Sequence, residues 1–573
     1  MRFSRIGVGI GVALYALSVM AGCAKHRIAP NASVGCAQLL RARVSASAIG
    51  LPTRGAVVTS ATAIPASTAS GRLALPAYCK VLGSILPVDP TASAINFEID
   101  LPAAWNGKAL MLGGGGFNGT IPDTTGNFPA GPVDQPVPLA RGYAVVASDS
   151  GHQAPRSSQW ILAPAMDASF AVNAEALRNF QGDALKKTHD VAVELIRKRY
   201  AVARVHKFYF AGGSTGGREA LQVVSKWPQD WDGAISWYPA WNHVSLVLQV
   251  GRAARALAVP GAWPDQAKRR LLFDAMLSVC DQLDGVEDGL VSNVVACRAA
   301  FEPATVQFRG MPLRCRGGTD LGDHCLADAQ LQALQVLDTR IDFNPPLASG
   351  ETHYPGYNVY LGDLGIARDS PLQFIVTGLA LGSRSPEGPL VAGQSPSMNV
   401  FWDQWVRFVF AGDEKYDALS LDPVTRGTLR PRIDEASRTL DANTTDFSAF
   451  AAKGGKLIIA HGTADVLVST RATEEYVARI QITMGAEKAR KFLRYYEVPG
   501  YGHGLSTVFN AAWDSLAVLD NWVQSDLSPP AQVVMDSLGR PGRTRPLCEY
   551  PSWPRYRGTG DVDAASSFFC ASQ

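Results

Sequence analysis

Short apolar runs recur along the first 240 residues, and each is followed by glycine-rich or polar positions. Runs of this length, rich in β-branched and aromatic residues and bounded by turn residues, predict strands. The predicted strands in this half of the chain are 80–85, 95–100, 109–112, 143–147 and 205–210. Residues 183–200 carry apolar side chains at helical spacing, which predicts an amphipathic helix before the last of these strands. Strands and helices in this arrangement indicate an α/β fold.

The pattern changes after residue 240. Residues 241–445 are irregular, proline-rich and aromatic, and strand-like runs return only at 456–460 and 493–498. We therefore expect a lid inserted between two parts of one α/β domain, 36–240 and 446–573.

The strand at 205–210 runs into a glycine-rich turn around a serine. The turn reads Gly-Gly-Ser-Thr-Gly-Gly over residues 212–217, and a helix-forming segment follows it. Strand, G-x-S-x-G and helix form the nucleophile elbow of α/β-hydrolases, where small neighbours let strand and helix approach a strained serine. The alternative is an ordinary glycine-rich turn, but the flanking strand and helix favour Ser214 as a nucleophile.

A serine nucleophile needs a base and an acid, which this fold supplies after the serine in the order acid, then histidine. Asp465 follows the predicted strand 456–460, and His503 follows 493–498. Loops after the carboxyl ends of strands are where open α/β sheets build sites. Alone, His503 would more simply be a loop histidine, whereas the ordered trio favours a base oriented by Asp465. His152 precedes the elbow, so we interpret it as structural.

Two further segments contain candidate binding groups, one for an oxyanion and one for a metal ion. Glycines 113–116 end an early strand, where this fold places an oxyanion-hole N–H, although a mobile glycine loop is the alternative. Residues 280–290 carry three aspartates separated by glycines, and such oxygen donors suit Ca²⁺. The spacing is not that of an EF-hand, and a solvated acidic turn is the alternative.

The composition and the N-terminal sequence indicate which binding partners and which cellular compartment to expect. The formal net charge of +2 gives no indication of nucleic-acid binding. Residues 1–23 combine early arginines, an apolar run and small residues before Cys23, which predicts a signal peptide of the bacterial lipoprotein type. A plain secretory signal is the alternative. Residues 24–35 are then a tether, and the protein is exported as an outer-membrane lipoprotein or as a periplasmic or secreted protein.

The cysteines agree with export. The chain has nine, so removing Cys23 leaves an even number, as expected for disulfides in an oxidising compartment. Their spacing suggests four local pairs, though spacing alone does not fix the connectivity. The suggested pairs are Cys36 with Cys79, Cys280 with Cys297, Cys315 with Cys325, and Cys548 with Cys570.

Five motifs together resemble the tannase and feruloyl esterase family, over nearly the whole chain from Cys36 to Cys570. They are GGSTGGREAL, CDQLDGVEDGLVSN, AHGTAD, VPGYGHG and RTRPLCEYP. The resemblance implies an α/β-hydrolase domain, a lid that carries Ca²⁺, and hydrolysis of esters of hydroxylated aromatic acids without an organic cofactor. It also implies roles for individual residues. Ser214 would be the nucleophile, Asp465 the acid, His503 the base, the N–H groups of Thr215 and Gly116 the oxyanion donors, and Asp281, Asp284, Asp288 and the carbonyls of Val286 and Leu290 the calcium ligands.

One departure and several alternatives qualify this resemblance. The family commonly joins the residue before the serine to the residue after the histidine by a disulfide, but here these residues are Gly213 and Gly504. The family also includes bacterial mono(2-hydroxyethyl) terephthalate hydrolases, so a terephthalate half-ester is the alternative substrate. In the lid stretch 380–405 the only arginine is Arg384, which we cannot assign to carboxylate binding, so we expect a neutral phenolic acyl group. A serine peptidase, an acyltransferase or a catalytically inactive binding protein on the same scaffold are further alternatives.

Overall fold

The computed structural model describes residues 34–67, 74–154, 163–365 and 370–572. The predicted signal peptide, Cys23 and most of the tether lie outside these ranges. Among the described residues, the longest apolar helices fall short of what a membrane crossing requires.

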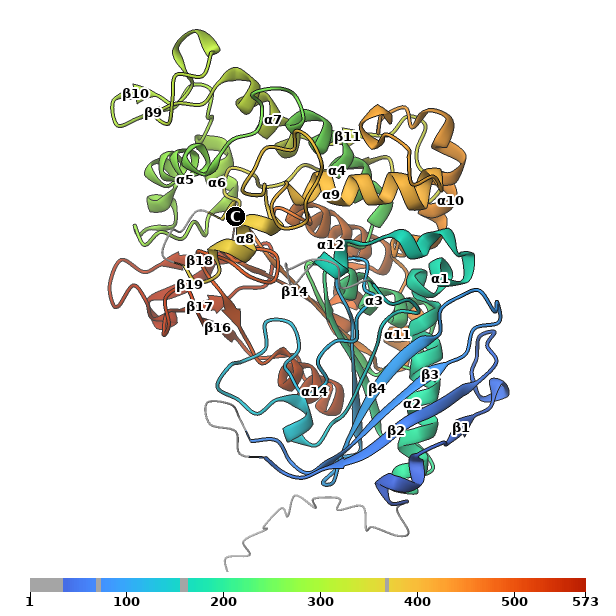
Figure 1. Ribbon diagram of the computed structural model, residues 1–573. Coiled ribbons are helices and arrows are strands. Elements are labelled where there is room, and N and C mark those ends of the chain that lie inside the picture. The colour runs from blue at the N-terminus through green and yellow to red at the C-terminus, as the bar shows by residue number, and fades with distance from the viewer. Residues whose placement is uncertain (1–33, 68–73, 155–162, 366–369, 573) are drawn as a thin grey trace, which may run out of the picture.

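A ten-stranded mixed sheet forms the centre of the molecule (Figure 1). Six neighbouring strands, from β6 to β14, are parallel, and the four at the other edge are joined antiparallel. In spatial order the strands are β1 (Arg43–Val44), β2 (Ala56–Ile64), β3 (Tyr78–Ile85), β4 (Ile95–Pro102), β6 (Ala144–Ser148), β5 (Lys108–Leu112), β7 (Lys207–Gly213), β8 (Gly233–Trp237), β13 (Lys456–Gly462) and β14 (Leu493–Val498).

Helices cover both faces of this sheet, so its parallel strands are buried on both sides. The helices of the α/β part are α1 (Ala174–Arg178), α2 (Ala184–Tyr200), α3 (Thr215–Lys226), α12 (Thr470–Met484), α13 (Ala486–Phe492) and α14 (Ser515–Ser525). Successive residues of β13 belong alternately to two apolar cores: Leu457 packs in the core that includes α2, and Ile458 in the core that includes α14. This layered arrangement confirms the predicted α/β-hydrolase architecture.

The segment between β8 and β13 gathers at one end of the sheet in Figure 1. Its helices at that end are α4 (His243–Leu257), α5 (Gln266–Cys280), α6 (Val294–Ala300), α7 (Asp328–Asp338), α8 (Gln373–Leu379), α9 (Ser397–Gln404) and α10 (Arg430–Leu440), and α11 (Ser448–Ala452) leads back to the start of β13. Two short hairpins accompany them, β9 (Gln307–Phe308) with β10 (Met311–Pro312) and β11 (Ile341–Asp342) with β12 (His353–Tyr354). The sequence indicated irregular structure here. The helices of this segment were not predicted. α4, for example, is buried on nearly every side, so it lacks the polar face by which an amphipathic helix is recognised in a sequence.

The C-terminal segment adds two small antiparallel sheets. One contains β15 (Ala511–Ala512), β16 (Gln532–Asp536) and β17 (Thr544–Leu547), and the other pairs β18 (Trp553–Tyr556) with β19 (Phe568–Ala571).

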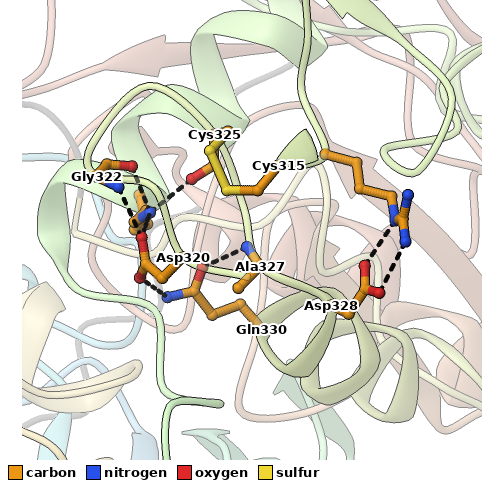
Figure 2. The surroundings of a disulfide bond; sticks show 9 residues. Cys315, Asp320, Gly322, Cys325, Ala327, Asp328 and Gln330 are labelled. Carbon is orange, nitrogen blue, oxygen red and sulfur yellow. Dashed lines mark hydrogen bonds and ion pairs between the residues drawn. A yellow bond between two sulfur atoms is a disulfide. The ribbon is translucent and has the colours of Figure 1, made fainter. Parts of the chain in front are cut away.

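All four suggested disulfides are present, and the pairing is confirmed. Figure 2 shows Cys315–Cys325 beside Asp320 and Gln330. The buried ammonium of Lys268 donates to the Asp320 carboxylate at 2.7 Å and to the carbonyls of Gly322 and Cys325 at 2.6 Å each. A polar network therefore fixes this loop in addition to its disulfide. Such bridges are typical of an exported protein.

The disulfides allow a stability comparison. Cys36–Cys79 closes 43 residues and Cys315–Cys325 closes 10. Because a bridge restricts the unfolded chain more when its loop is longer, replacing the first pair by alanines is expected to lower the free energy of unfolding by about 1 kcal/mol more than replacing the second. Urea unfolding of the two double variants measures this difference, and an equal or reversed loss would contradict it.

Candidate active site

Ser214 occupies the turn between β7 and α3. Its φ of 61° lies in the left-handed region, and its side chain makes no capping hydrogen bond to the helix. Its N–H donates to the Trp237 carbonyl at 3.0 Å, which ties the turn to the end of β8. A Cβ at Gly217 would lie 2.5 Å from the same carbonyl, so the close approach of α3 and β8 requires glycine there. The serine is held in the strained geometry of a nucleophile elbow.

Asp465 and His503 come together from the loops after β13 and β14. Nδ1 of His503 lies 2.7 Å from Oδ2 of Asp465. An ionised carboxylate only accepts hydrogen bonds, so Nδ1 carries the proton and Nε2 is left as an acceptor. This is the tautomer that a general base for a serine requires.

The carboxylate of Asp465 is fully buried and saturated with donors. Oδ1 accepts from the N–H groups of Leu467 at 2.8 Å and Val468 at 3.0 Å. Oδ2 accepts from His503 and also from Nε2 of His461 at 3.2 Å. Burial alone would raise the pKa of Asp465, but the positive charge that His503 carries when it is protonated and the hydrogen bonds from both histidines lower it below its usual range. Asp465 is therefore a fixed negative charge.

The glycine loop after β5 lies against the start of α3. Thr215 donates its hydroxyl to the Gly116 carbonyl at 2.6 Å, and the Gly114 N–H donates to Glu219 at 3.2 Å. Gly116 has a φ of 55°, and a Cβ there would lie 2.1 Å from the Ala165 carbonyl oxygen. The loop is thus fixed by backbone geometry and by the buried Glu219, which also accepts from Asn118 at 2.6 Å.

A cavity of about 380 Å³ joins these elements. Its lining includes Ser214, Thr215, His503 and the glycine loop on one side, and residues from α4, α8 and α9 on the other. The described lining contains no lysine, arginine, aspartate or glutamate. The apolar side chains that line it are Phe117, Pro129, Ala165, Met166, Ala240, Leu246, Val247, Val250, Leu379, Met398, Phe401, Trp405, Leu467, Val468 and Leu505.

Two buried histidines are neutral. His243 lines the cavity beside Trp405, with 4.8 Å between the ring centroids. Its pKa lies well below the usual value, mainly because the ring is buried and also because Arg218 is a nearby positive charge. His152 stacks on Phe170 at 3.5 Å between centroids, is not a lining residue, and has its pKa lowered to about 4 by burial.

The three aspartates of the acidic loop are partly or fully buried. Asp281 accepts from the Gly289 N–H at 3.0 Å, Asp284 accepts from the Ser292 N–H at 2.9 Å, and Asp288 pairs with Arg545. Burial raises the pKa of all three carboxyls, that of Asp284 to about 7, and the charge of Asp288 raises those of the other two further. Three carboxylates gathered in one loop, of which Asp288 pairs with Arg545, form with the backbone carbonyls of that loop a donor set that fits a hard divalent cation.

In the acidic loop, the carboxylate oxygens of Asp281, Asp284 and Asp288 do not all lie within 4.8 Å of one another. Across the ranges given above, the one group of three ligand side chains with atoms within 4.8 Å of one another is His189, Asp190 and Asp230. Lys186 already pairs with both carboxylates of that group, because its ammonium lies 2.7 Å from Asp190 and 2.8 Å from Asp230.

Three residues at the site were missed by the sequence analysis: Tyr238, His461 and Glu219. His461 stands in AHGTAD and Glu219 in GGSTGGREAL, so each lies inside a motif that was already singled out. Tyr238 carries no such signal. It lies between Gly213 and Gly504, the two positions where the family commonly has a disulfide.

Comparison with known proteins places the chain. The sequence profile described as Tannase and feruloyl esterase matches residues 79–571. An uncharacterized esterase of Agrobacterium fabrum is 40% identical over 94% of this chain and 94% of that protein. Mono(2-hydroxyethyl) terephthalate hydrolase of Piscinibacter sakaiensis is 29% identical over 89% of this chain and 87% of its own. The crystal structure of feruloyl esterase B from Aspergillus oryzae superposes with a TM-score of 0.69 at 19% identity, covering 90% of this chain and 97% of that one. The chain belongs to the tannase and feruloyl esterase family and is a carboxylic ester hydrolase.

Proposed function

We propose that this esterase hydrolyses esters of hydroxylated aromatic acids by a two-step acyl transfer through Ser214, His503 and Asp465. The observation that carries the proposal is the 2.7 Å bond between His503 and Asp465 at a cavity that Ser214 and His503 both line.

In the first step, Ser214 attacks the ester carbonyl while Nε2 of His503 takes the hydroxyl proton. Asp465 holds Nδ1 of His503 and stabilises the imidazolium that forms. The N–H groups of Thr215 and Gly116 are the proposed donors to the oxyanion. Thr215 is the first residue of α3, and Gly116 lies in the glycine loop that packs against the start of α3. His503 then passes its proton to the leaving alcohol, which leaves an acyl-enzyme on Ser214.

In the second step, water replaces the alcohol. His503 takes a proton from the water, the hydroxide attacks the acyl carbonyl, and the proton returns to Ser214 as the acid departs. Ser214 and His503 therefore act in both steps of the proposed reaction.

The triad is tested by Ser214→Ala and Asp465→Asn. Loss of a triad member is expected to lower kcat by about 10⁴-fold or more. Folding of Ser214→Ala is expected to stay intact, because the Ser214 side chain makes no capping hydrogen bond to α3. Steady-state hydrolysis of methyl ferulate and a thermal melt measure the two effects. An activity loss under tenfold for Ser214→Ala would reject the mechanism, and an inactive binding protein would show no hydrolysis in the parent enzyme.

The cavity favours a neutral aromatic acyl group. Flat rings pack well on aromatic side chains, and Phe117 meets Phe401 and Trp405 edge-on at 5.2 and 5.6 Å between centroids. A terephthalate half-ester would bring a carboxylate, which calls for a cation. Arg384 donates to the Pro389 carbonyl at 3.0 Å and is not a lining residue. The named activity of the Piscinibacter relative keeps the half-ester as the second candidate.

The substrate proposal is tested by kcat/KM on methyl gallate, methyl ferulate and the terephthalate half-ester, measured side by side. The two neutral esters are expected to lead because the described residues of the cavity lining offer no counter-charge for a carboxylate. A tenfold or greater lead of the half-ester would overturn the substrate proposal and leave the reaction class standing.

We further propose a structural Ca²⁺ bound by Asp281, Asp284 and Asp288 with the carbonyls of Val286 and Leu290. A bound cation supplies positive charge that offsets the repulsion among the buried carboxylates. These residues belong to the segment 241–445, the proposed lid, which also contains the disulfides Cys280–Cys297 and Cys315–Cys325. The protein is exported, and Cys23 is the proposed site of a lipid anchor.

Chelation tests the calcium proposal. Removing Ca²⁺ with EGTA is expected to lower the melting temperature by several degrees before it changes kcat, because the ligands belong to the loop between α5 and α6 and the cavity lining does not. Folded, active protein that contains no calcium by elemental analysis would reject the site.

A further inference from the structure

Tyr238 follows β8 directly and lines the cavity together with Ser214 and His503. Its ring centroid lies 4.8 Å from that of the His503 imidazole, with the planes inclined at 55°. A Cβ at Gly213 would lie 2.6 Å from its ring and hydroxyl oxygen, and a Cβ at Gly504 would lie 3.1 Å from that oxygen. The phenol therefore fills the space between the residue before the nucleophile and the residue after the base.

The backbone of Tyr238 is held firmly. Its N–H donates to the Ala460 carbonyl at 2.7 Å, and the carbonyl of the preceding Trp237 accepts from Ser214 at 3.0 Å. Its φ is 34°, which is unfavourable for an aromatic residue and persists only where the surroundings impose it. The ring is thus fixed to the turn that carries Ser214 and to β13, which leads to Asp465.

The hydroxyl of Tyr238 extends this contact to the histidine loop. It interacts with the hydroxyl of Tyr501, which donates to the Gly504 carbonyl at 2.8 Å. Gly504 has a φ of 75°, so the loop turns sharply at this contact. A second tyrosine therefore connects the phenol to the backbone beside His503.

We propose that Tyr238 is a positioning residue that fixes His503 relative to Ser214 and stabilises the imidazolium formed when His503 takes the serine proton. This inference rests on the proposed function, in which His503 is the base. A cation within about 6 Å of a phenol ring is attracted to it, whereas a neutral imidazole gains much less. The contact therefore strengthens as the reaction proceeds, which raises kcat and leaves KM nearly unchanged.

The other ionisable groups around His503 do not replace this contact. Asp465 binds Nδ1 and supplies the opposite charge. His461 lies beyond Asp465, with its ring 6.4 Å from that of Tyr238. Asp363 accepts from the hydroxyls of Ser506 and Thr507, both at 2.7 Å, and so supports the far end of the same loop.

The test compares Tyr238→Leu, which removes the ring, with Tyr238→Phe, which keeps it. The leucine variant is expected to lose about 10- to 100-fold in kcat on methyl ferulate with KM changed less than about threefold. The phenylalanine variant is expected to stay within about fivefold of the parent. Sulfonylation of Ser214 by phenylmethylsulfonyl fluoride, which also needs the base, is expected to slow in the same order.

Tyr143→Leu is the matched control. Tyr143 is a buried tyrosine of the same core but precedes β6, at the end of the parallel strands away from the cavity. Its loss is expected to lower the melting temperature without changing kcat. If Tyr238→Leu does not fold, Tyr238→Met fills a similar volume without a ring and is expected to show the same loss.

Two outcomes overturn the inference: a ring-less variant within twofold of the parent in kcat, or a phenylalanine variant as impaired as the leucine variant. Failure of the proposed function looks different, because Ser214→Ala would then remain active. With Ser214 essential and Tyr238→Leu silent, the triad stands and the role of Tyr238 is rejected.

Discussion

The constraint on which the site depends is the close packing of backbone around Ser214. The turn after β7 lies against the end of β8 through the hydrogen bond from Ser214 to Trp237, and against the glycine loop through the bond from the Gly216 N–H to the Gly114 carbonyl at 3.0 Å. Side chains larger than hydrogen cannot enter these contacts. Because three segments meet there without intervening side chains, the backbone of the sheet and its loops fixes the position of Ser214, the proposed nucleophile.

The buried charge of Asp465 complements this backbone arrangement. Taking an ionised carboxylate out of water is unfavourable unless donors replace the lost hydration. Two N–H groups and two imidazoles supply them, so the charge is retained at a fully buried position. The imidazole of His503 has only one of these bonds, and its other nitrogen is left for chemistry. The carboxylate of Asp465 thus orients His503, the proposed base, whereas backbone packing positions Ser214, the proposed nucleophile.

Much of this arrangement could be predicted from the sequence, and the exceptions have physical causes. The strands that carry Ser214, Asp465 and His503 are apolar, bounded by glycines and close to their predicted limits, because a buried parallel strand leaves a strong local pattern. β8 was not predicted: Gly-Ala-Ile-Ser-Trp is short and its identity as a strand comes from pairing with β7 and β13. β2 was missed because this strand near the sheet edge is rich in small and hydroxyl-bearing residues.

The candidate site shows the same division. Ser214, Asp465 and His503 stand in recognisable motifs and fixed order, so the sequence could nominate them. Tyr238 could not be nominated, because its importance arises from two glycines, one 25 residues before it and one in the other half of the sheet, that face it only in the folded chain. The cavity wall from α4, α8 and α9 also depends on tertiary packing, which overrides the weak helical pattern of that segment.

The insertion between β8 and β13 has a consequence for how the protein reaches this state. β8 and β13 are hydrogen-bonded neighbours, yet about 200 residues separate them in the chain. During export the elbow half emerges first, and β8 remains an uncovered edge until the distant strand arrives. Closing so long a loop is slow, since the ordering entropy is lost before the pairing contacts form. Ser214 and His503, the proposed nucleophile and base, therefore come together only once β13 and β14 have joined β8 in the sheet, and a chain without that pairing lacks the proposed site.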